Sequence, residues 1–443
     1  MEHELERSTI SKLTARLIPM LFIIWFVNYL DRVNIGFAAL QMNKELALTP
    51  QMFGFAAGIF YAGYILFEIP SNMLMRRFGA RTWIARIIFT WGLVSIGQAA
   101  ISSPYQLYSA RFLLGVAEAG FLPGVMYYLT CWFPAEYRAK AIGQVYSANT
   151  LSIVIGAPLS GIVMSMTDHV AGLSGWKWMF IAEGAPAVLL GIVAFFYLTN
   201  RPSEAKWLSA SERQWLISRM DQDHKAAEKL GTSSFRVAVS RPIVWLLGVL
   251  YFSIGIGFFG VSVWLPQVIR QMSNLSLVQI GFVNAIPFLL GTIAMLLNGK
   301  HSDRTRERRW HLAIPLAIGT AGLVASAMTS TNPALSFAFV CIATTGIVGA
   351  LSVFWAVPSA FLSGAGAAGG LALINTISAF SGFTAPYMIG WIRSMTPDFA
   401  IATYAMAGGI GVATLLAALL PYPDRFKKDE LPASAHAPEP KEL

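Results

Sequence analysis

The stretch LIPMLFIIWFVNYLDRVNIGFAAL, residues 17–40, is long enough to cross a lipid bilayer as one helix, and its only charged side chains are Asp31 and Arg32. A membrane-spanning helix needs roughly 20 mostly apolar residues. Further runs of this kind follow along the chain, at 51–73, 82–102, 105–131, 142–166, 177–199, 242–268, 277–299, 311–330, 335–360, 371–392 and 399–421. The sequence therefore predicts an all-α polytopic membrane protein with twelve transmembrane helices.

The composition excludes an ordinary soluble domain. Of the 443 residues, 55% are hydrophobic and 12% are charged, whereas soluble domains are typically about 45–50% apolar and about 25% charged. The two cysteines, Cys131 and Cys341, lie near the ends of membrane runs in different halves of the chain. In those places they support neither a disulfide framework nor a metal site, and we expect no cofactor.

The basic residues predict the orientation in the membrane. If both termini are cytoplasmic, the internal segments hold 25 of the 32 lysines and arginines, and the external connections hold only Lys44, Lys177, Arg270 and Arg393. Cytoplasmic loops carry such an excess in membrane proteins. The net charge of +9 is thus an insertion signal, and we expect no nucleic-acid partner.

The chain divides into two similar halves. We predict an N-terminal six-helix bundle over 1–200, a charged cytoplasmic connector over 201–241, a C-terminal six-helix bundle over 242–428 and a disordered cytoplasmic tail over 429–443. The segment NMLMRRFGAR follows the second run and GKHSDRTRERR follows the eighth, at equivalent positions of the two halves. Paired six-helix repeats are a recurrent transporter architecture, with the substrate held between them near the middle of the membrane.

These motifs carry a family resemblance. The spacing of Gly299, Asp303 and Arg304, followed by Arg308-Arg309, resembles the cytoplasmic loop motif of the major facilitator superfamily, although the first-half copy has Asn72 and Arg76 at the Gly and Asp positions. The stretches YLDRVNIGFA, GYILFEIPSN, RFLLGVAEAGFLPG and WFPAEYRAKAIG together resemble the anion:cation symporter family within it. That resemblance implies a bacterial inner-membrane carrier of organic acids such as tartrate or phthalate.

A few ionisable residues lie well inside the predicted helices, namely Asp31, Arg32, Arg111 and Glu118. Each costs about 2.5–3.5 kcal/mol to insert, so such residues usually mark ion or substrate paths. At 1.5 Å of rise per residue, Asp31 lies roughly 13 Å from the external end, between Arg111 at about 9 Å and Glu118 at about 19 Å. We therefore expect Asp31 to pair with Arg111 if the first and fourth helices are neighbours.

Two readings of these charges stay open. They are either a structural cluster that locks two helices together, or a functional set in which a desolvated carboxylate takes up and releases protons and an arginine holds a carboxylate substrate. We favour the second reading. The resemblance implies the same roles: Asp31 and Glu118 couple protons and Arg32 binds the anion.

The second half has no charge in the middle of its helices, so we expect it to supply neutral recognition. The resemblance points to Asn149, Ser352, Trp355 and Asn375 as cavity residues, and Tyr29 and Tyr64 are further candidates from the first half. Any of these side chains could instead satisfy contacts between helices. One arginine with neutral polar groups suits a small organic monoanion or dianion.

The favoured function is secondary active transport: proton-coupled uptake of a small organic carboxylate by alternating access. An organic-anion exchanger or exporter is the alternative, because VIGAPLSG at 154–161 partly resembles a motif associated with exporters. A membrane sensor or enzyme is a third class, disfavoured because the sequence carries no P-loop and no hydrolase motif. We expect a monomer in the lipid bilayer, with no catalytic residues and no metal.

Overall fold

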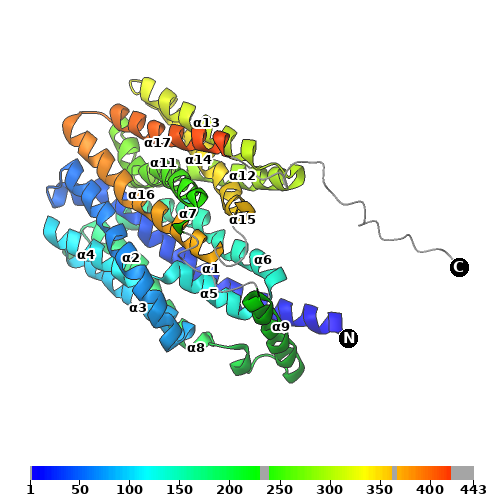
Figure 1. Cartoon of the computed structure of the whole chain (residues 1–443). Coiled ribbons are helices and arrows are strands. Elements are labelled where there is room, and N and C mark those ends of the chain that lie inside the picture. The colour runs from blue at the N-terminus through cyan, green and yellow to red at the C-terminus, as the bar shows by residue number, and fades with distance from the viewer. Residues whose placement is uncertain (1, 230–238, 362–366, 421–443) are drawn as a thin grey trace.

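The computed structural model describes residues 2–229, 239–361 and 367–420. Within these ranges the chain forms helices joined by short connections, without strands. The predicted tail over 429–443 lies outside the described residues. Figure 1 shows the two halves of the chain as two helix bundles that lie side by side.

The N-terminal bundle contains α1 to α8, and α9 belongs to the connector. The bounds are α1 (Glu2–Glu45), α2 (Pro50–Phe78), α3 (Ala80–Gly97), η1 (Gln98–Ala100), α4 (Pro104–Glu118), α5 (Phe121–Trp132), α6 (Ala135–Tyr146), α7 (Ala148–Thr167), α8 (Gly175–Tyr197) and α9 (Ala210–Lys229). Two predicted runs are each divided into two helices. The run at 105–131 becomes α4 and α5, and the run predicted at 142–166 begins earlier, as α6 followed by α7.

The C-terminal bundle contains α11 to α17. The bounds are α11 (Pro242–Met272), α12 (Leu277–Thr305), α13 (Arg309–Met328), α14 (Pro333–Ala356), α15 (Pro358–Phe361), α16 (Ala367–Met395) and α17 (Ala400–Leu419). Eleven candidate spans of the described chain are long and apolar enough to cross a membrane. The remaining predicted span, at 371–392, is α16, a 29-residue helix that packs against α2 and α11 and carries polar residues on its inner side, such as Ser378 and Ser381.

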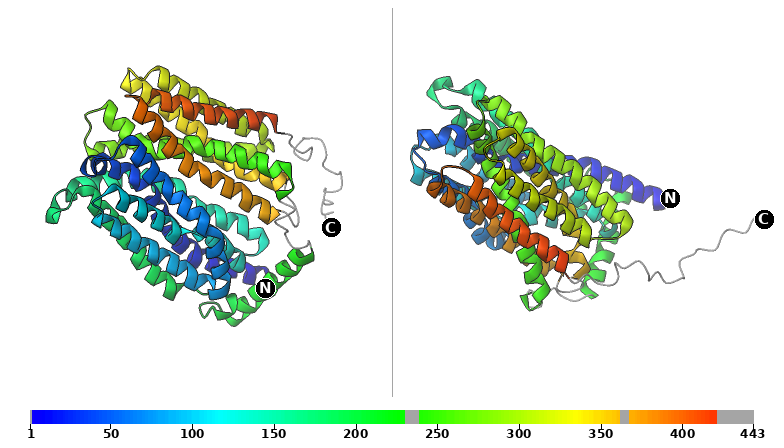
Figure 2. Two further views of the ribbon diagram at one scale, coloured as in Figure 1. Left: turned by 60° about the vertical axis from the view of Figure 1, so that its left-hand side comes forward. Right: turned by 90° about the horizontal axis from the view of Figure 1, so that it is seen from above.

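The start of α1, the connector helix α9 and the end of α17 lie at one end of the molecule, which we call the connector end (Figure 2). The opposite end, which we call the far end, holds the turns after α1, α7, α11 and α16. At the connector end α9 is fixed to α1 by Glu212, whose carboxylate accepts hydrogen bonds from Ser8 at 2.8 Å and Lys12 at 2.9 Å. This arrangement places the connector beside the N-terminal bundle.

The two bundles are joined in their far halves. There α2 packs against α16, α7 against α12, and α1 against α11. Asn43 donates a hydrogen bond to Gln267 at 3.1 Å, and Gln51 donates one to Tyr387 at 3.3 Å. These contacts close the far end of the space between the bundles.

Glycine permits this close approach. A Cβ atom on Gly281 of α12 would lie 2.6 Å from the carbonyl oxygen of Ala157 and 2.8 Å from Cα of Pro158, both in α7. A Cβ atom on Gly161 would lie 2.5 Å from the carbonyl oxygen of Leu277. The α7–α12 contact therefore depends on positions without a side chain.

Candidate functional site

A cavity of about 100 Å³ lies between the two bundles. Both halves of the chain line it, and its aromatic wall includes Trp25, Phe121, Phe258 and Phe259. Its polar lining residues are Asn28, Tyr29, Arg32, Tyr61, Tyr64, Tyr146, Asn149, Tyr251, Asn375 and Ser378. Among these lining residues Arg32 is the one with a charge.

Arg32 is held at the cavity by a carboxylate and two aromatic rings. Its Nε donates to Oε2 of Glu118 at 3.0 Å, and its guanidinium carbon lies 5.0 Å from the ring centre of Tyr64 and 5.5 Å from that of Phe60. The Glu118 side chain is fully buried, whereas that of Arg32 is 14% exposed. A guanidinium carries five N–H donors, so the bond from Nε leaves further donors on Arg32.

Asn28 completes this cluster. It lies one helical turn before Arg32 on the same face of α1, and its side-chain amide donates to the same Glu118 oxygen at 2.9 Å. The Glu118 carboxylate therefore joins α4 to α1 by two hydrogen bonds. Its other oxygen, Oε1, is buried and has no hydrogen-bond partner.

Glu118 is the last residue of α4, where the fourth span breaks. Gly120 adopts φ +84°, a left-handed conformation that favours glycine, and a Cβ atom there would lie 2.5 Å from Oγ of Ser71. The new helix, α5, begins at Phe121, and Phe121 and Leu122 line the cavity. The break therefore sets both the buried carboxylate and a helix N-terminus, with its partial positive charge, beside the cavity.

Asp31 points away from the cavity, into the N-terminal bundle. Its carboxylate accepts hydrogen bonds from Nε1 of Trp91 and from Oγ of Ser95, both at 2.8 Å and both on α3. The prediction that Asp31 pairs with Arg111 is wrong for this structure, in which the two form no ion pair. The reason is that α3, and not α4, presents hydrogen-bond donors to that face of α1.

Arg111 is instead a buried cation against an aromatic ring. It is 1% exposed, its guanidinium carbon lies 5.2 Å from the ring centre of Phe60, and its Nε and Nη1 have no hydrogen-bond partner. Phe60 thus contacts both Arg111 and Arg32. A cation–π contact of this kind partly offsets the cost of burying the charge.

Most of the neutral residues predicted at the site line the cavity, and two do not. Tyr29, Tyr64, Asn149 and Asn375 are among the lining residues. The hydroxyl of Ser352 donates to the carbonyl oxygen of Met295 at 3.0 Å, and Trp355 packs edge-on against Tyr251 at 5.1 Å between ring centres. These two predicted cavity residues therefore lie beside the cavity described here, because α14 turns Leu351 toward it instead.

Sequence reasoning missed several lining residues. Asn28 was detectable, because a polar residue four positions before Arg32 shares its helix face. The break at Gly120 was also detectable from the glycine and the nearby Pro123. No local signal distinguishes the lining tyrosines, Tyr61, Tyr146 and Tyr251, from ordinary packing aromatics.

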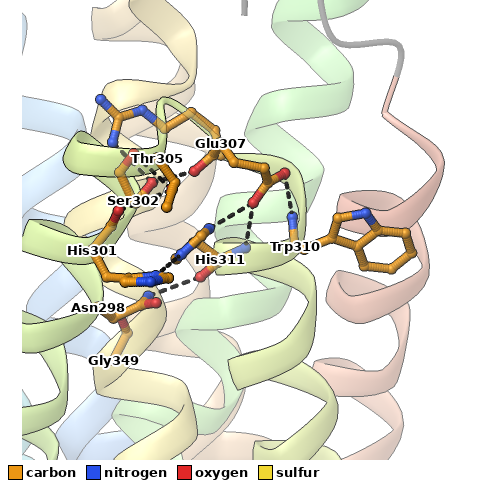
Figure 3. Close-up of polar contacts among 9 residues, drawn as sticks. Asn298, His301, Ser302, Thr305, Glu307, Trp310, His311 and Gly349 are labelled. Atoms are coloured by element: carbon orange, nitrogen blue, oxygen red, sulfur yellow. Dashed lines mark hydrogen bonds and ion pairs between the residues drawn. The ribbon is translucent and has the colours of Figure 1, made fainter. Parts of the chain in front are cut away.

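The predicted loop motif after the eighth span forms a compact turn at the connector end, between α12 and α13. Asp303 forms an ion pair with Arg308 at 2.7 Å, and Ser302 donates to the carbonyl oxygen of Glu307 at 2.5 Å. Figure 3 shows Glu307 in turn reaching His311 of α13, with His301 of α12 beside it. Gly299 gives room to α14, since a Cβ atom there would lie 3.0 Å from Oγ of Ser352, and Arg304 is in the last turn of α12.

The sequence matches the family model described as "Major Facilitator Superfamily" over residues 21–386. A protein of Agrobacterium vitis named "Putative tartrate transporter" is 43% identical over 424 residues, which cover 95% of this chain and 96% of that protein. A protein of Pseudomonas putida named "Putative metabolite transport protein NicT" is 41% identical over 411 residues, 93% of this chain and 94% of that protein.

A solved structure shares the fold at low sequence identity. The bacterial homologue of the human lysosomal transporter Spinster, in an inward-facing and unoccupied conformation, superposes with a TM-score of 0.72. It is 18% identical, and the match covers 90% of this chain and 95% of that one. The two chains therefore share their fold.

Proposed function

Because this chain belongs to the Major Facilitator Superfamily, and is thus a multi-pass membrane protein of a transporter family, we propose that it is a proton-coupled symporter that takes up a small organic carboxylate. The observation that carries the proposal is the Arg32–Glu118 pair at the cavity between the bundles. It sets a cation for the substrate and a carboxylate for the proton in direct contact.

Arg32 binds the substrate in this proposal. A planar guanidinium can hold a carboxylate through two parallel hydrogen bonds, and the Tyr64 and Phe60 rings fix its orientation. Asn375 and Ser378 of the C-terminal bundle lie across the cavity and hydrogen-bond the remaining oxygen atoms of the ligand. A substrate that contacts both bundles favours the closed arrangement over the open one.

Glu118 couples the proton to the substrate. An ionised Glu118 neutralises Arg32 and repels an incoming carboxylate, and a protonated Glu118 leaves the full positive charge of Arg32 to the substrate. Each ligand therefore raises the affinity for the other, as linkage requires. Asp31 is a second protonatable group. It precedes Arg32 in the sequence but lies on another face of α1.

The substrate class rests on three supports. The cavity is smaller than the roughly 300–1,000 Å³ of sites for drug-sized ligands, its one charged lining residue is a cation, and a relative covering nearly the whole chain is named for tartrate. A small hydroxylated dicarboxylate or a similar monoanion fits these properties. The connector end would face the cytoplasm of a bacterial inner membrane, as the basic residues predict, and the carrier would act as a monomer with protons and no cofactor.

The test is uptake into proteoliposomes of purified protein, with radiolabelled tartrate as the probe and no substrate inside. An imposed proton gradient, acid outside, is expected to drive accumulation that a protonophore abolishes. Uptake that requires tartrate inside and ignores the proton gradient would establish the alternative, an exchanger. A thermal-shift screen of other organic acids at concentrations well above their dissociation constants would identify a better ligand.

A further inference from the structure

A further carboxylate, besides Glu118 and Asp31, is buried in the N-terminal bundle. Glu183 of α8 is 3% exposed and accepts a hydrogen bond from Oγ of Ser160 in α7 at 2.7 Å. It also accepts one from Nδ2 of Asn34 in α1 at 2.9 Å. Nothing in the cavity contacts this group, so substrate binding does not explain it.

Asn34 connects this carboxylate to Asp31. Its Nδ2 donates to Glu183 and also lies 3.3 Å from Oδ1 of Asp31. The two carboxylates thus share one amide group at a site where Asp31, Asn34 and Glu183 are each at most 3% exposed. Because one amide group joins the two carboxylates, protonation of one changes the proton affinity of the other.

The donors to this pair are neutral. Asp31 is hydrogen-bonded by Trp91, Ser95 and Asn34, and Glu183 by Ser160 and Asn34. In the described part of the chain, neither carboxylate forms an ion pair with a lysine or arginine. The buried Arg111 of α4 lies within electrostatic range of Asp31, so it partly compensates one of the two negative charges. A second negative charge in this apolar interior is strongly unfavourable, so the pair retains a proton.

On the helices that pack against α8, few charged residues lie near the pair, and α4, which packs against α3, adds the buried Arg111 on the Asp31 side. On α1 the nearest is Asp31 itself, and Arg32 points to the other side, toward Glu118. The sequences of α7 and η1 contain no charged residue. On α3 the arginines, Arg81 and Arg86, lie in the first two turns at the connector end, so no cation from these helices neutralises Glu183.

The hydrogen bonds of the Asn34 side chain depend on which carboxyl group holds the proton. Its Oδ1 is buried and has no hydrogen-bond partner, although a buried acceptor is normally satisfied. A protonated carboxyl group would donate to that oxygen, while Nδ2 continues to donate to the ionised partner. A change of side-chain rotamer therefore accompanies transfer of the proton from one carboxyl group to the other.

The pair also lies next to the contact that closes the far end. Ser160, which donates to Glu183, is followed by Gly161, which packs against Leu277 of α12. Glu183 lies eight residues from the start of α8, or about 12 Å from the far end. A change in the charge of Glu183 is thus transmitted to the α7–α12 contact through one residue.

We propose that Glu183 is a further coupling residue, which shares a proton with Asp31 through Asn34 and sets the stability of the far-end contact between α7 and α12. This inference extends the proposed proton symport and rests on it for its role in uptake. The step is a proton transfer in which Asp31 gains the proton that Glu183 loses. Protonation of the pair weakens the repulsion between the two carboxylates. Loss of the proton changes the ratio of closed to open far end.

The test measures the far-end distance as a function of pH. Spin labels at Ser102 and Thr331, on far-end loops of the two bundles, are introduced after replacement of Cys131 and Cys341 by serine. The distance distribution of the parent protein in lipid is expected to change between pH 5 and pH 9 in two steps, one from Glu118 and one from the pair. Glu183→Gln is expected to remove one step and Glu118→Gln the other, whereas Glu136→Gln, an exposed carboxylate at the connector end, leaves both.

The outcomes separate this inference from the proposed function. A Glu183→Gln titration that superposes on that of the parent would refute the inference, even if the parent accumulates tartrate in response to protons. A parent that ignores the proton gradient would refute the proposed symport, while the distance titration still tests the pair. If Glu183→Gln does not reach the membrane, Ser160→Ala keeps both carboxyl groups and is expected to weaken the pH response of the far end without changing tartrate affinity.

Discussion

A single methyl group at Gly281 is expected to open the far end of the protein. In Gly281→Ala the new Cβ atom would lie 2.6 Å from the carbonyl oxygen of Ala157 and 2.8 Å from Cα of Pro158, and both are backbone atoms that cannot rotate away. Restoring ordinary contact distances requires α7 and α12 to separate by roughly 1 Å, and overpacking of this kind costs about 1–3 kcal/mol. The cost falls on the closed far end, so the ratio of open to closed protein should rise by about 5- to 150-fold.

The assay is the alkylation rate of a cysteine in the cavity. Ser378 lines the cavity and is 5% exposed, so Ser378→Cys in a background without Cys131 and Cys341 reacts with an impermeant maleimide added at the far side only when that side opens. Gly143→Ala is the matched control, because no atom lies within 4 Å of a Cβ there and alanine stabilises the helix interior by about 0.5–1 kcal/mol. Equal labelling rates in Gly281→Ala, Gly143→Ala and the parent would show that the α7–α12 contact does not hold the far end closed.

Three further predictions concern the charged residues. Glu118→Gln is expected to abolish proton-driven accumulation of tartrate in proteoliposomes while exchange down a gradient persists, because the amide oxygen still accepts from Arg32 but the amide does not take up or release a proton. Normal accumulation with a normal pH dependence would contradict the coupling role. Arg32→Lys is expected to weaken tartrate binding about 10- to 100-fold in a thermal-shift titration, since charge-assisted hydrogen bonds contribute about 1.5–3 kcal/mol and lysine lacks the bidentate fork; unchanged affinity would make Arg32 a structural residue. At the connector, burial alone would raise the pKa of Glu212, but hydrogen bonds from Lys12, the Ser209 amide and Ser8 lower it to about 2. Because this value lies below the ordinary value of about 4.3, the stabilisation of the α9 contact is present above pH 4.3 and is lost as the pH falls toward 2; Trp215 fluorescence should follow that loss, and a Glu212→Gln variant that keeps the same acid transition would refute the assignment.

The sequence alone identified the elements that hydrophobicity controls. Runs of about 20 apolar residues have few alternatives to membrane helices, because an unpaired backbone is too costly in lipid. The membrane helices were therefore predictable from local pattern. The rarity of charge in these runs also identified Asp31, Arg32, Arg111 and Glu118 as residues that need an explanation.

The partners of those charges were not predictable from the sequence. The depth comparison placed Asp31 level with helix four, yet its partners are Trp91 and Ser95 of α3, and Glu118 contacts Arg32 instead. Depth along a helix gives only one coordinate of a residue. A contact also depends on which helix is the neighbour and on how both helices are rotated about their axes. Those are decided by packing across the whole bundle.

The same limit applies to Glu183. From the sequence it is a polar residue near a helix end, and its position gives no sign of Asn34 or Ser160, which are 149 and 23 residues away. Only the tertiary structure brings α1, α7 and α8 together so that one amide joins two carboxylates. What the sequence by itself determined is which residues are apolar enough to cross the membrane and which charges are buried with them, because transfer from water depends on each segment alone. Which buried charge meets which partner depends on three-dimensional packing, because hydrogen bonds form only between atoms that the fold brings within about 3 Å.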